Sequence, residues 1–344
     1  MRQIWIPQAG DPTVLEVREA PDPRPGPGEV RVAVEAAGIN FADILARQGL
    51  YPDAPPLPAV VGYEVAGRVD AVGAGVTAFA EGDAVIALAR FGGYTSHLVA
   101  PVARVFARPD GMTAETGAAI PVNYLTAFQM MIVMGSVRHA RELGGRRVRV
   151  LVHGASGGVG TACADIGKAY GAELFGTASP GKHDYVRERG YHHAIDYRND
   201  DFVAEVVRLT DGEGVDLVLD PIGGKHWARS LETLSPSGRL VVYGISAIAG
   251  GGKLELAKAL VGIPWLKVNP VRLLNANQGV LGVNVGHLWD EAPRVAGWMR
   301  AILGMYRRGD VRPHVDRVFT FDEAADAHRY IEERRNTGKV LLRP

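Results

Sequence analysis

The sequence predicts an α/β protein built from a β-rich part and a doubly wound parallel sheet, and three features of its 344 residues support this fold class. Up to about residue 105, short runs rich in β-branched residues alternate with clusters of glycine and proline. After about residue 125, apolar strands alternate with helical stretches, as in a parallel sheet covered by helices. A glycine-rich turn joins one of these strands to the next helix, which is typical of a dinucleotide-binding (Rossmann) domain.

The predicted strands fall into two groups. In the first part, residues 30–34, 64–69 and 84–88 indicate a compact antiparallel barrel or sandwich. The proline-rich residues 21–28 are expected to form a surface turn, because proline lacks the N–H that a helix or central strand needs. In the second part, a full dinucleotide-binding sheet is expected from residues 148–153, 173–178, 193–197, 215–220, 239–243 and 279–285. A last strand at 340–342 is expected to rejoin the first part.

The composition excludes several classes of partner. The 38 basic and 38 acidic residues cancel, so no overall field attracts nucleic acid or an anionic lipid surface. The single cysteine, Cys163, rules out a disulfide framework or a cysteine-rich metal site and fits a reducing cytoplasm. No signal-peptide pattern opens the chain, and no apolar stretch is long enough to cross a bilayer. We therefore expect a cytoplasmic protein with no nucleic acid partner and no integral membrane association.

The glycine-rich turn is the sharpest local signal. The sequence Gly154-Ala-Ser-Gly157-Gly158-Val159-Gly160 follows the strand at 148–152 and opens a helical run at 161–170. Glycines allow a tight turn and a close approach of the backbone to a pyrophosphate, which then meets the N–H groups of the helix N-terminus. Ala155 stands at the first glycine of the usual GxGxxG pattern and is small enough to fit. Gly157, Gly158 and Val159 are therefore predicted to bind the cofactor.

The end of the second strand of this domain predicts NADPH as the cofactor. NAD enzymes place an acid there, about 20 residues after the glycines, to bind the ribose hydroxyls. Here the chain reads Gly176-Thr177-Ala-Ser179-Pro-Gly-Lys182, in which a hydroxyl and a cation suit a 2′-phosphate. Asp184 lies nearby and keeps NAD as an alternative, while Tyr197 is predicted to close over the same phosphate.

Several motifs are spread along almost the whole chain: Ala37-Gly-Ile-Asn40-Phe-Ala-Asp43, Arg47-Gln-Gly-Leu-Tyr51, Gly62-Tyr-Glu64-Val-Ala-Gly67, Ile120-Pro-Val-Asn123-Tyr-Leu-Thr126-Ala127, the glycine turn and Asn336-Thr-Gly-Lys-Val340. With these motifs the sequence resembles the zeta-crystallin-like quinone oxidoreductases of the medium-chain dehydrogenase/reductase superfamily. The stretches Phe175-Gly-Thr-Ala-Ser179, Ile195-Asp-Tyr197 and Leu273-Leu-Asn-Ala-Asn277 look closer still to its vesicle amine transport protein-like branch.

The resemblance implies a discontinuous architecture. A GroES-like catalytic domain would contain residues 1–124 and the returning residues 284–344, and a Rossmann NADPH-binding domain would occupy residues 125–283. It also implies an active site between the domains and a homodimer joined along the Rossmann sheet edges. The apolar residues 261–268, which precede the last Rossmann strand, agree with such an interface.

The same resemblance implies the site residues. Asn40, Asp43 and Tyr51 would line the substrate side as catalytic residues, with Asn40 and Tyr51 as hydrogen-bond donors to a carbonyl. For Asp43 a helix-start carboxylate is the alternative, and for Tyr51 a surface aromatic. Asn123 and Thr126 are implied to contact the nicotinamide and its ribose, Gly244 to lie where the ribose passes, and the backbone around Val283 and Val285 to hold the carboxamide. Asn336 is implied to reach the cofactor from the returning tail, with a turn residue before Gly338 as the alternative.

No metal is expected. Zinc enzymes of this superfamily carry Cys, His and Cys where this chain resembles them at Asn40, Tyr63 and Asn123, and the ten histidines show no tight ligand spacing. Without a Lewis acid, the acceptor must already be electrophilic, as a quinone or a conjugated carbonyl is. The alternatives are an enoyl or 2-alkenal double-bond reductase and a non-enzymatic NADPH-binding vesicle-associated or scaffold protein.

Overall fold

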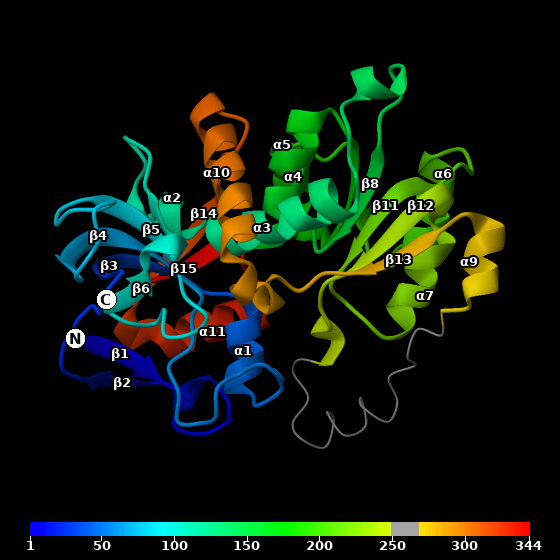
Figure 1. Ribbon diagram of the computed structural model, residues 1–344. Helices are drawn as coiled ribbons and strands as arrows, with labels where there is room; N and C mark the ends of the chain where they lie inside the picture. Colours follow the sequence, from blue (N-terminus) through cyan, green and yellow to red (C-terminus); the bar gives the residue numbers. More distant parts are fainter. Residues whose placement is uncertain (249–267) are drawn as a thin grey trace. The chain divides into compact units, whose positions relative to one another are not determined.

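The computed structural model describes residues 1–248 and 268–344, and the chain forms two compact units (Figure 1). Unit 1 consists of Met1–Asn123, Gly286–Gly304 and Pro313–Pro344, and unit 2 consists of Tyr124–Val285 and Met305–Arg312. Both termini therefore lie in unit 1. Residues 249–267, which include most of the stretch expected at a dimer interface, lie outside the described part of the chain.

Unit 1 is built around a mostly antiparallel sheet in the order β14-β15-β3-β4-β5-β7. An additional strand, β6, pairs with the first half of β3. The strands are β3 (Glu29–Gly38), β4 (Glu64–Val72), β5 (Ala84–Leu88), β6 (His97–Pro101), β7 (Val105–Ala107), β14 (Val315–Thr320) and β15 (Lys339–Arg343), and a separate ribbon pairs β1 (Arg2–Trp5) with β2 (Glu16–Glu19). The helices are α1 (Phe41–Arg47), α2 (Ala114–Ala118), α11 (Ala324–Glu332) and α10 (Ala292–Arg308), whose last residues belong to unit 2.

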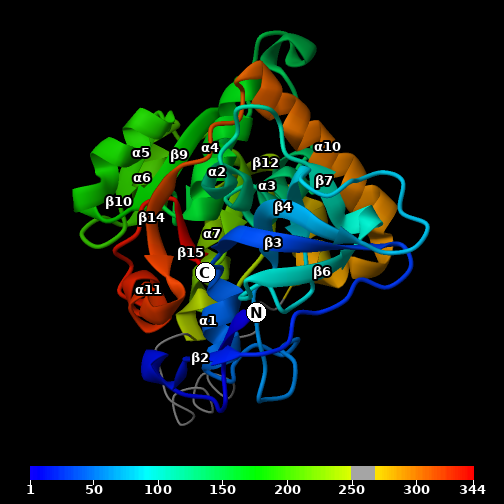
Figure 2. The ribbon, with the colours of Figure 1, turned by 90° about the vertical axis from the view of Figure 1, so that its left-hand side faces the viewer.

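The core of unit 1 follows from alternation along its strands. In β3, Val30, Val32 and Val34 are buried and every second residue is partly exposed, because successive side chains of a strand point to opposite faces. The C-terminal strand β15, which lies beside β14 in Figure 2, pairs antiparallel with β3 and parallel with β14. The predicted return of residues 340–342 to the first part of the chain is thus observed.

Unit 2 contains a six-stranded, all-parallel sheet in the order β10-β9-β8-β11-β12-β13, which is the Rossmann order. Its strands are β8 (Arg149–His153), β9 (Glu173–Ala178), β10 (His193–Asp196), β11 (Val215–Asp220), β12 (Leu234–Val242) and β13 (Gly279–Gly282). Its helices are α4 (Gly158–Tyr170), α5 (His183–Arg189), α6 (Phe202–Leu209), α7 (Lys225–Glu232) and α9 (Pro270–Ala276), and α3 (Pro121–Phe128) leads into it through π-helical residues Gln129–Met134. The predicted fold class is confirmed.

Short 3-10 helices cover Pro12–Val14, Val102–Arg104, Ala140–Leu143, Pro180–Lys182, Ser246–Ile248, Val285–His287, Trp289–Glu291 and Phe321–Glu323. None of the helices in the described part of the chain combines the length and the apolar character needed to cross a membrane.

The strands of unit 2 differ from the predicted ones mainly at their ends. The bounds of β9 and β11 match the prediction, whereas β13 stops at Gly282 because Val285 already belongs to a 3-10 turn. β12 begins five residues earlier than predicted, at Leu234, which pairs with Val215 on β11 before a register shift. The central strands are apolar on both faces, as expected where helices cover both sides of a parallel sheet.

Candidate functional site

The glycine turn of unit 2 has the backbone conformation that its sequence predicts. β8 ends at His153, Gly154 has φ 72°, and α4 begins at Gly158 with Gly157 as its N-cap. A Cβ on Gly160 would lie 2.4 Å from the carbonyl oxygen of Ala155, so only glycine fits there. Ala155 itself is accommodated because it faces Gly176, where an added Cβ would come within 2.6 Å of its methyl group.

The turn leaves donors for an anion. The first N–H groups of a helix have no acceptor within the helix, and here they belong to the segment around Gly158 and Val159. The turn is held from the next strand, since the N–H of Gly154 donates to Thr177 Oγ1 at 3.3 Å and that of Ala155 to the Thr177 carbonyl at 3.0 Å. Thr177 therefore lies against the turn, inside unit 2.

The residues predicted to select the cofactor come from neighbouring strand ends. Ser179 is the N-cap of the 3-10 turn that ends at Lys182, and the Lys182 N–H donates to the Ser179 carbonyl at 2.9 Å. Asp196 pairs in register with Ala178, which brings Tyr197 to the same edge. The Asp184 side chain is 95% exposed and forms an ion pair with Arg187 at 3.2 Å. The acid that left NAD open as an alternative is thus engaged with an arginine.

The remaining predicted cofactor residues are distributed over both units. Gly244 and Val283 follow β12 and β13 at the carboxyl edge of the parallel sheet, with the Val283 N–H donating to Val242 at 2.9 Å, and Val285 begins the next 3-10 turn. Asn123 and Thr126 lie one helical turn apart on α3. Asn336 belongs to unit 1, where its Nδ2 donates to the Gly338 carbonyl at 3.0 Å in the turn before β15.

Unit 1 contains a buried polar cluster around Asn40 that we call the Asn40 cluster (Asn40, Glu64 and Lys339). The Asn40 Nδ2 donates to Glu64 Oε1 at 3.0 Å, and the Lys339 Nζ donates to Asn40 Oδ1 at 2.7 Å and to Glu64 Oε1 at 2.5 Å. The other Glu64 oxygen accepts from the Val122 N–H at 2.6 Å. The exposed fractions of the Glu64 and Lys339 side chains are 0% and 3%, so the cluster holds a desolvated ion pair.

The sheet order explains how this cluster forms. Asn40 follows β3, Glu64 opens β4 and Lys339 opens β15, and these three strands are neighbours in the sheet. Sequence reasoning identified Asn40 and missed its two partners. The available signal was a single charged residue at the start of each of two apolar strands, Glu64-Val-Ala and Lys339-Val-Leu-Leu.

Asp43 binds backbone N–H groups next to this cluster. Its Oδ2 accepts from the Asn40 N–H at 2.8 Å and its Oδ1 from the Gly62 N–H at 3.0 Å. Burial raises the pKa of Asp43 to about 7, while the two backbone hydrogen bonds and the Lys339 ammonium oppose that rise. This geometry agrees with the helix-start interpretation. Tyr51 packs at the margin of the unit 1 core, and catalytic roles for both residues stay predictions.

The positions compared with zinc ligands in the sequence carry a donor set that does not suit zinc. Both ends of the Asn40 amide are engaged, its Nδ2 by Glu64 and its Oδ1 by the Lys339 ammonium. Tyr63 and Asn123 offer no thiolate or imidazole. The single cysteine, Cys163, is buried in α4 of unit 2.

Comparison with known proteins places the chain in a family. Residues 26–118 match the alcohol dehydrogenase GroES-like domain, and residues 189–342 match a family described as zinc-binding dehydrogenase. The human synaptic vesicle membrane protein VAT-1 homolog is 40% identical over 337 residues, covering 97% of this chain and 84% of that protein. A quinone oxidoreductase of Pseudomonas aeruginosa is 34% identical over 352 residues, covering 100% and 99%.

Among solved structures, the Escherichia coli quinone oxidoreductase complexed with NADPH superimposes with a TM-score of 0.86 at 28% identity, covering 100% of both chains. The parallel sheet with its glycine turn, the GroES-like match and these relatives agree with one another. The chain belongs to the medium-chain dehydrogenase/reductase superfamily of oxidoreductases, where it groups with the VAT-1 homologs and the quinone oxidoreductases.

Proposed function

We propose that this protein is an NADPH-dependent reductase of quinones or conjugated carbonyl compounds that works without zinc. The observation that carries the proposal is the Asn40 cluster, in which a buried lysine and glutamate hold an amide at positions where zinc enzymes hold their metal. An acceptor reduced there must itself delocalise the incoming charge onto an oxygen, as quinones and enones do. The P. aeruginosa and E. coli quinone oxidoreductases support the same reaction class.

Several residues receive proposed roles. NADPH, when bound, supplies the hydride. The Asn40 amide keeps one N–H beyond the one that it donates to Glu64, and this hydrogen is available to polarise an acceptor carbonyl. Tyr51 is proposed as a second donor, and Asp43 as a positioning residue that fixes the backbone on either side of Asn40. Asn123, Thr126 and Asn336 are proposed to orient the nicotinamide.

NADPH rather than NADH is proposed from the strand end that carries Ser179 and Lys182. A contact from the Lys182 ammonium to a 2′-phosphate contributes about 1.5–3 kcal/mol, roughly ten- to a hundredfold in affinity. The NADPH complex of the E. coli relative adds support.

The experiment measures cofactor oxidation with NADPH and NADH against 9,10-phenanthrenequinone, 1,4-benzoquinone and a 2-alkenal. We expect quinone reduction with NADPH, and we expect it to persist after dialysis against a strong chelator. Lys182→Ala should weaken NADPH binding about ten- to a hundredfold and leave NADH binding nearly unchanged. Lys168→Ala, on α4 of the same unit, is the matched control and should change neither. An equal loss of affinity for NADPH and NADH in Lys182→Ala would refute the proposed contact of Lys182 with the 2′-phosphate.

A second candidate, reduction of a carbon–carbon double bond, is favoured by the Asn40-to-Asp43 sequence shared with polyketide enoyl reductases. Turnover with the 2-alkenal but not with the quinones would show that the protein is a double-bond reductase. Turnover with none, together with NADPH binding, would select the non-enzymatic vesicle-associated role that the VAT-1 relatives support.

We also propose that the protein is a cytoplasmic homodimer. β13 is an edge strand of the unit 2 sheet, and α9 just before it exposes apolar side chains, with Leu274 73% exposed and Val271 62% exposed. An apolar surface beside a sheet edge that no other strand of residues 1–248 and 268–344 pairs with favours pairing with a second copy.

A further inference from the structure

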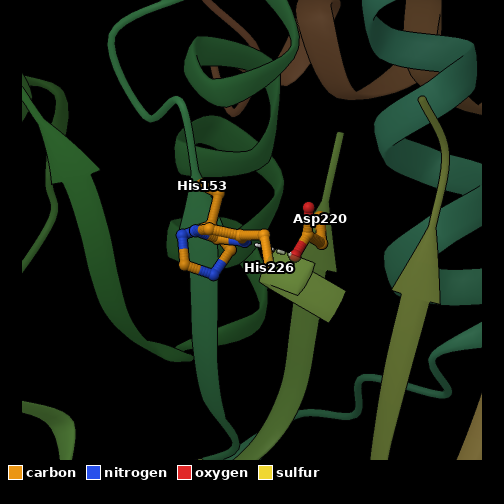
Figure 3. A group of neighbouring side chains, drawn as sticks. All are labelled: His153, Asp220 and His226. Atoms are coloured by element: carbon orange, nitrogen blue, oxygen red, sulfur yellow. Dashed lines mark hydrogen bonds and ion pairs between the residues drawn. The ribbon is translucent and has the colours of Figure 1, made fainter. Parts of the chain in front are cut away.

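Two histidines and an aspartate from distant parts of the sequence meet in unit 2 (Figure 3). His153 ends β8, Asp220 ends β11, and His226 lies in the first turn of α7. One ligand atom from each residue lies within 4.8 Å of the others. We call this group the His–Asp–His cluster. Sequence spacing gave no sign of it, because the adjacency of β8 and β11 in the sheet creates it.

Asp220 and His153 are each oriented by a partner outside the cluster. The Asp220 Oδ1 accepts from the Ile222 N–H at 2.7 Å, which leaves Oδ2 facing the His226 Nδ1 and the Ser230 Oγ, each at 2.7 Å. The His153 Nδ1 lies 3.1 Å from the Thr177 Oγ1, so its Nε2 faces inward. Metal-binding histidines and carboxylates are held in this way, with one atom toward the metal and the other on a fixed partner.

The surroundings of the cluster are apolar on one side. The ring of Phe202 stacks on that of His226 with centroids 4.8 Å apart and meets the ring of His153 edge-on at 4.9 Å. His153 and Asp220 are buried, while the His226 side chain is 20% exposed and gives an ion a way in. Apolar side chains around a metal site limit the access of solvent to the ion, and Phe202 is placed to do so here.

We propose that the His–Asp–His cluster binds one divalent first-row transition metal, with His153 Nε2, Asp220 Oδ2 and His226 as ligands. The Ser230 hydroxyl, 3.2 Å from the His153 Nε2 and 2.7 Å from the Asp220 Oδ2, is placed to complete the set. Tetrahedral ligands at about 2.0–2.1 Å from zinc lie about 3.3 Å apart, a spacing that these atoms reach with small side-chain shifts. Two imidazoles and a carboxylate suit zinc, nickel and cobalt rather than magnesium or calcium.

The buried carboxylate is the strongest attraction that the cluster offers to a cation. Asp220 is fully buried, and its partners are peptide N–H groups, a serine hydroxyl and the His226 imidazole. None of these partners carries a permanent positive charge, so a dication would add a charge interaction that the hydrogen bonds do not supply. The site consists of unit 2 residues and does not depend on the proposed reductase function.

The experiment uses the full-length protein without a polyhistidine tag, stripped of metal and titrated with Co²⁺ and then Zn²⁺. We expect one equivalent of Co²⁺ to produce the intense visible absorption of a four-coordinate site, and Zn²⁺ to displace it. His226→Ala should weaken Zn²⁺ binding about 100-fold or more, since loss of even an outer-shell partner costs about 10–100-fold.

The matched control is His193→Ala. His193 also lies in unit 2, is similarly exposed and pairs with a carboxylate, Glu173, at 2.9 Å, and it should leave metal binding unchanged. Anomalous diffraction from a Zn²⁺-soaked wild-type crystal provides a test that needs no variant, with a peak expected among the three side chains. Equal Zn²⁺ affinity in His226→Ala and wild type, or a crystal with no peak there, would overturn the proposal.

Discussion

Replacing Lys339 by methionine should cost this protein a large part of its stability. Methionine preserves most of the lysine stem but removes the ammonium that faces Asn40 Oδ1 and Glu64 Oε1. Glu64 would keep its hydrogen bonds from Asn40 and Val122 but would lose the cation beside it, with 0% of its side chain exposed. Removing one partner of a buried ion pair costs about 3–5 kcal/mol, against a total stability of about 5–15 kcal/mol for a typical domain.

The assay is urea unfolding at neutral pH, monitored by circular dichroism. Adding Glu64→Gln to Lys339→Met should recover a substantial part of the loss, because the uncompensated charge is then gone. The exposed pair of Arg208 with Glu205 supplies the control, and Arg208→Met should leave the transition midpoint almost unchanged. A loss below about 1 kcal/mol for Lys339→Met, as for surface ion pairs, would refute the view that this pair is desolvated.

Three further predictions concern other parts of the molecule. Because the pKa of Asp43 rises from 3.8 to about 7 on folding, the native state holds a proton that the unfolded chain has lost, so the contribution of Asp43 to stability should fall between about pH 4 and pH 7. Urea unfolding across that range should show this fall in wild type, and a parallel profile in Asp43→Asn would contradict it. Gly160→Ala should disturb the glycine turn and weaken NADPH binding in a fluorescence titration, whereas Gly297→Ala on α10, where a Cβ meets nothing within 4 Å, should not. Light scattering should give a dimer mass for wild type and a monomer mass for Leu274→Glu, and a wild-type monomer at all concentrations would reject the dimer.

The elements that the sequence predicted well are those with strong local signals. The turn requires a positive φ at Gly154 and the absence of a Cβ at Gly160. Only glycine meets these requirements readily, so the sequence itself reveals both. The start of β12 was missed because Leu234-Ser-Pro-Ser-Gly238 has the composition of a turn. Pairing with Val215 on β11 overrides that local preference, and Ser237 takes a φ of 69° within the strand.

The candidate site was predicted only in part, because its contacts cross the sequence. Asn40 was recognisable from its motif, but its environment depends on Lys339, nearly 300 positions away, which reaches it only because β15 lies beside β3. A single lysine at the start of an apolar strand carries no sign of what it will meet. Which residues touch substrate and cofactor, and where the functional domains begin and end, stay predictions for the same reason.

Two of the buried carboxylates, Glu64 and Asp220, show how the neighbouring strand determines what a buried charge can do. Glu64 and Asp220 both stand at strand ends and both are removed from solvent. Glu64 is neutralised by Lys339, an ammonium built into the same sheet, so its cluster is electrically complete without any bound ion. Asp220 faces the imidazole of His226 instead, and an imidazole nitrogen can exchange a proton for a metal, which an ammonium cannot. The Lys339 ammonium therefore makes the Asn40 cluster a fixed structural unit. The His226 imidazole, in contrast, leaves the His–Asp–His cluster able to bind a metal ion.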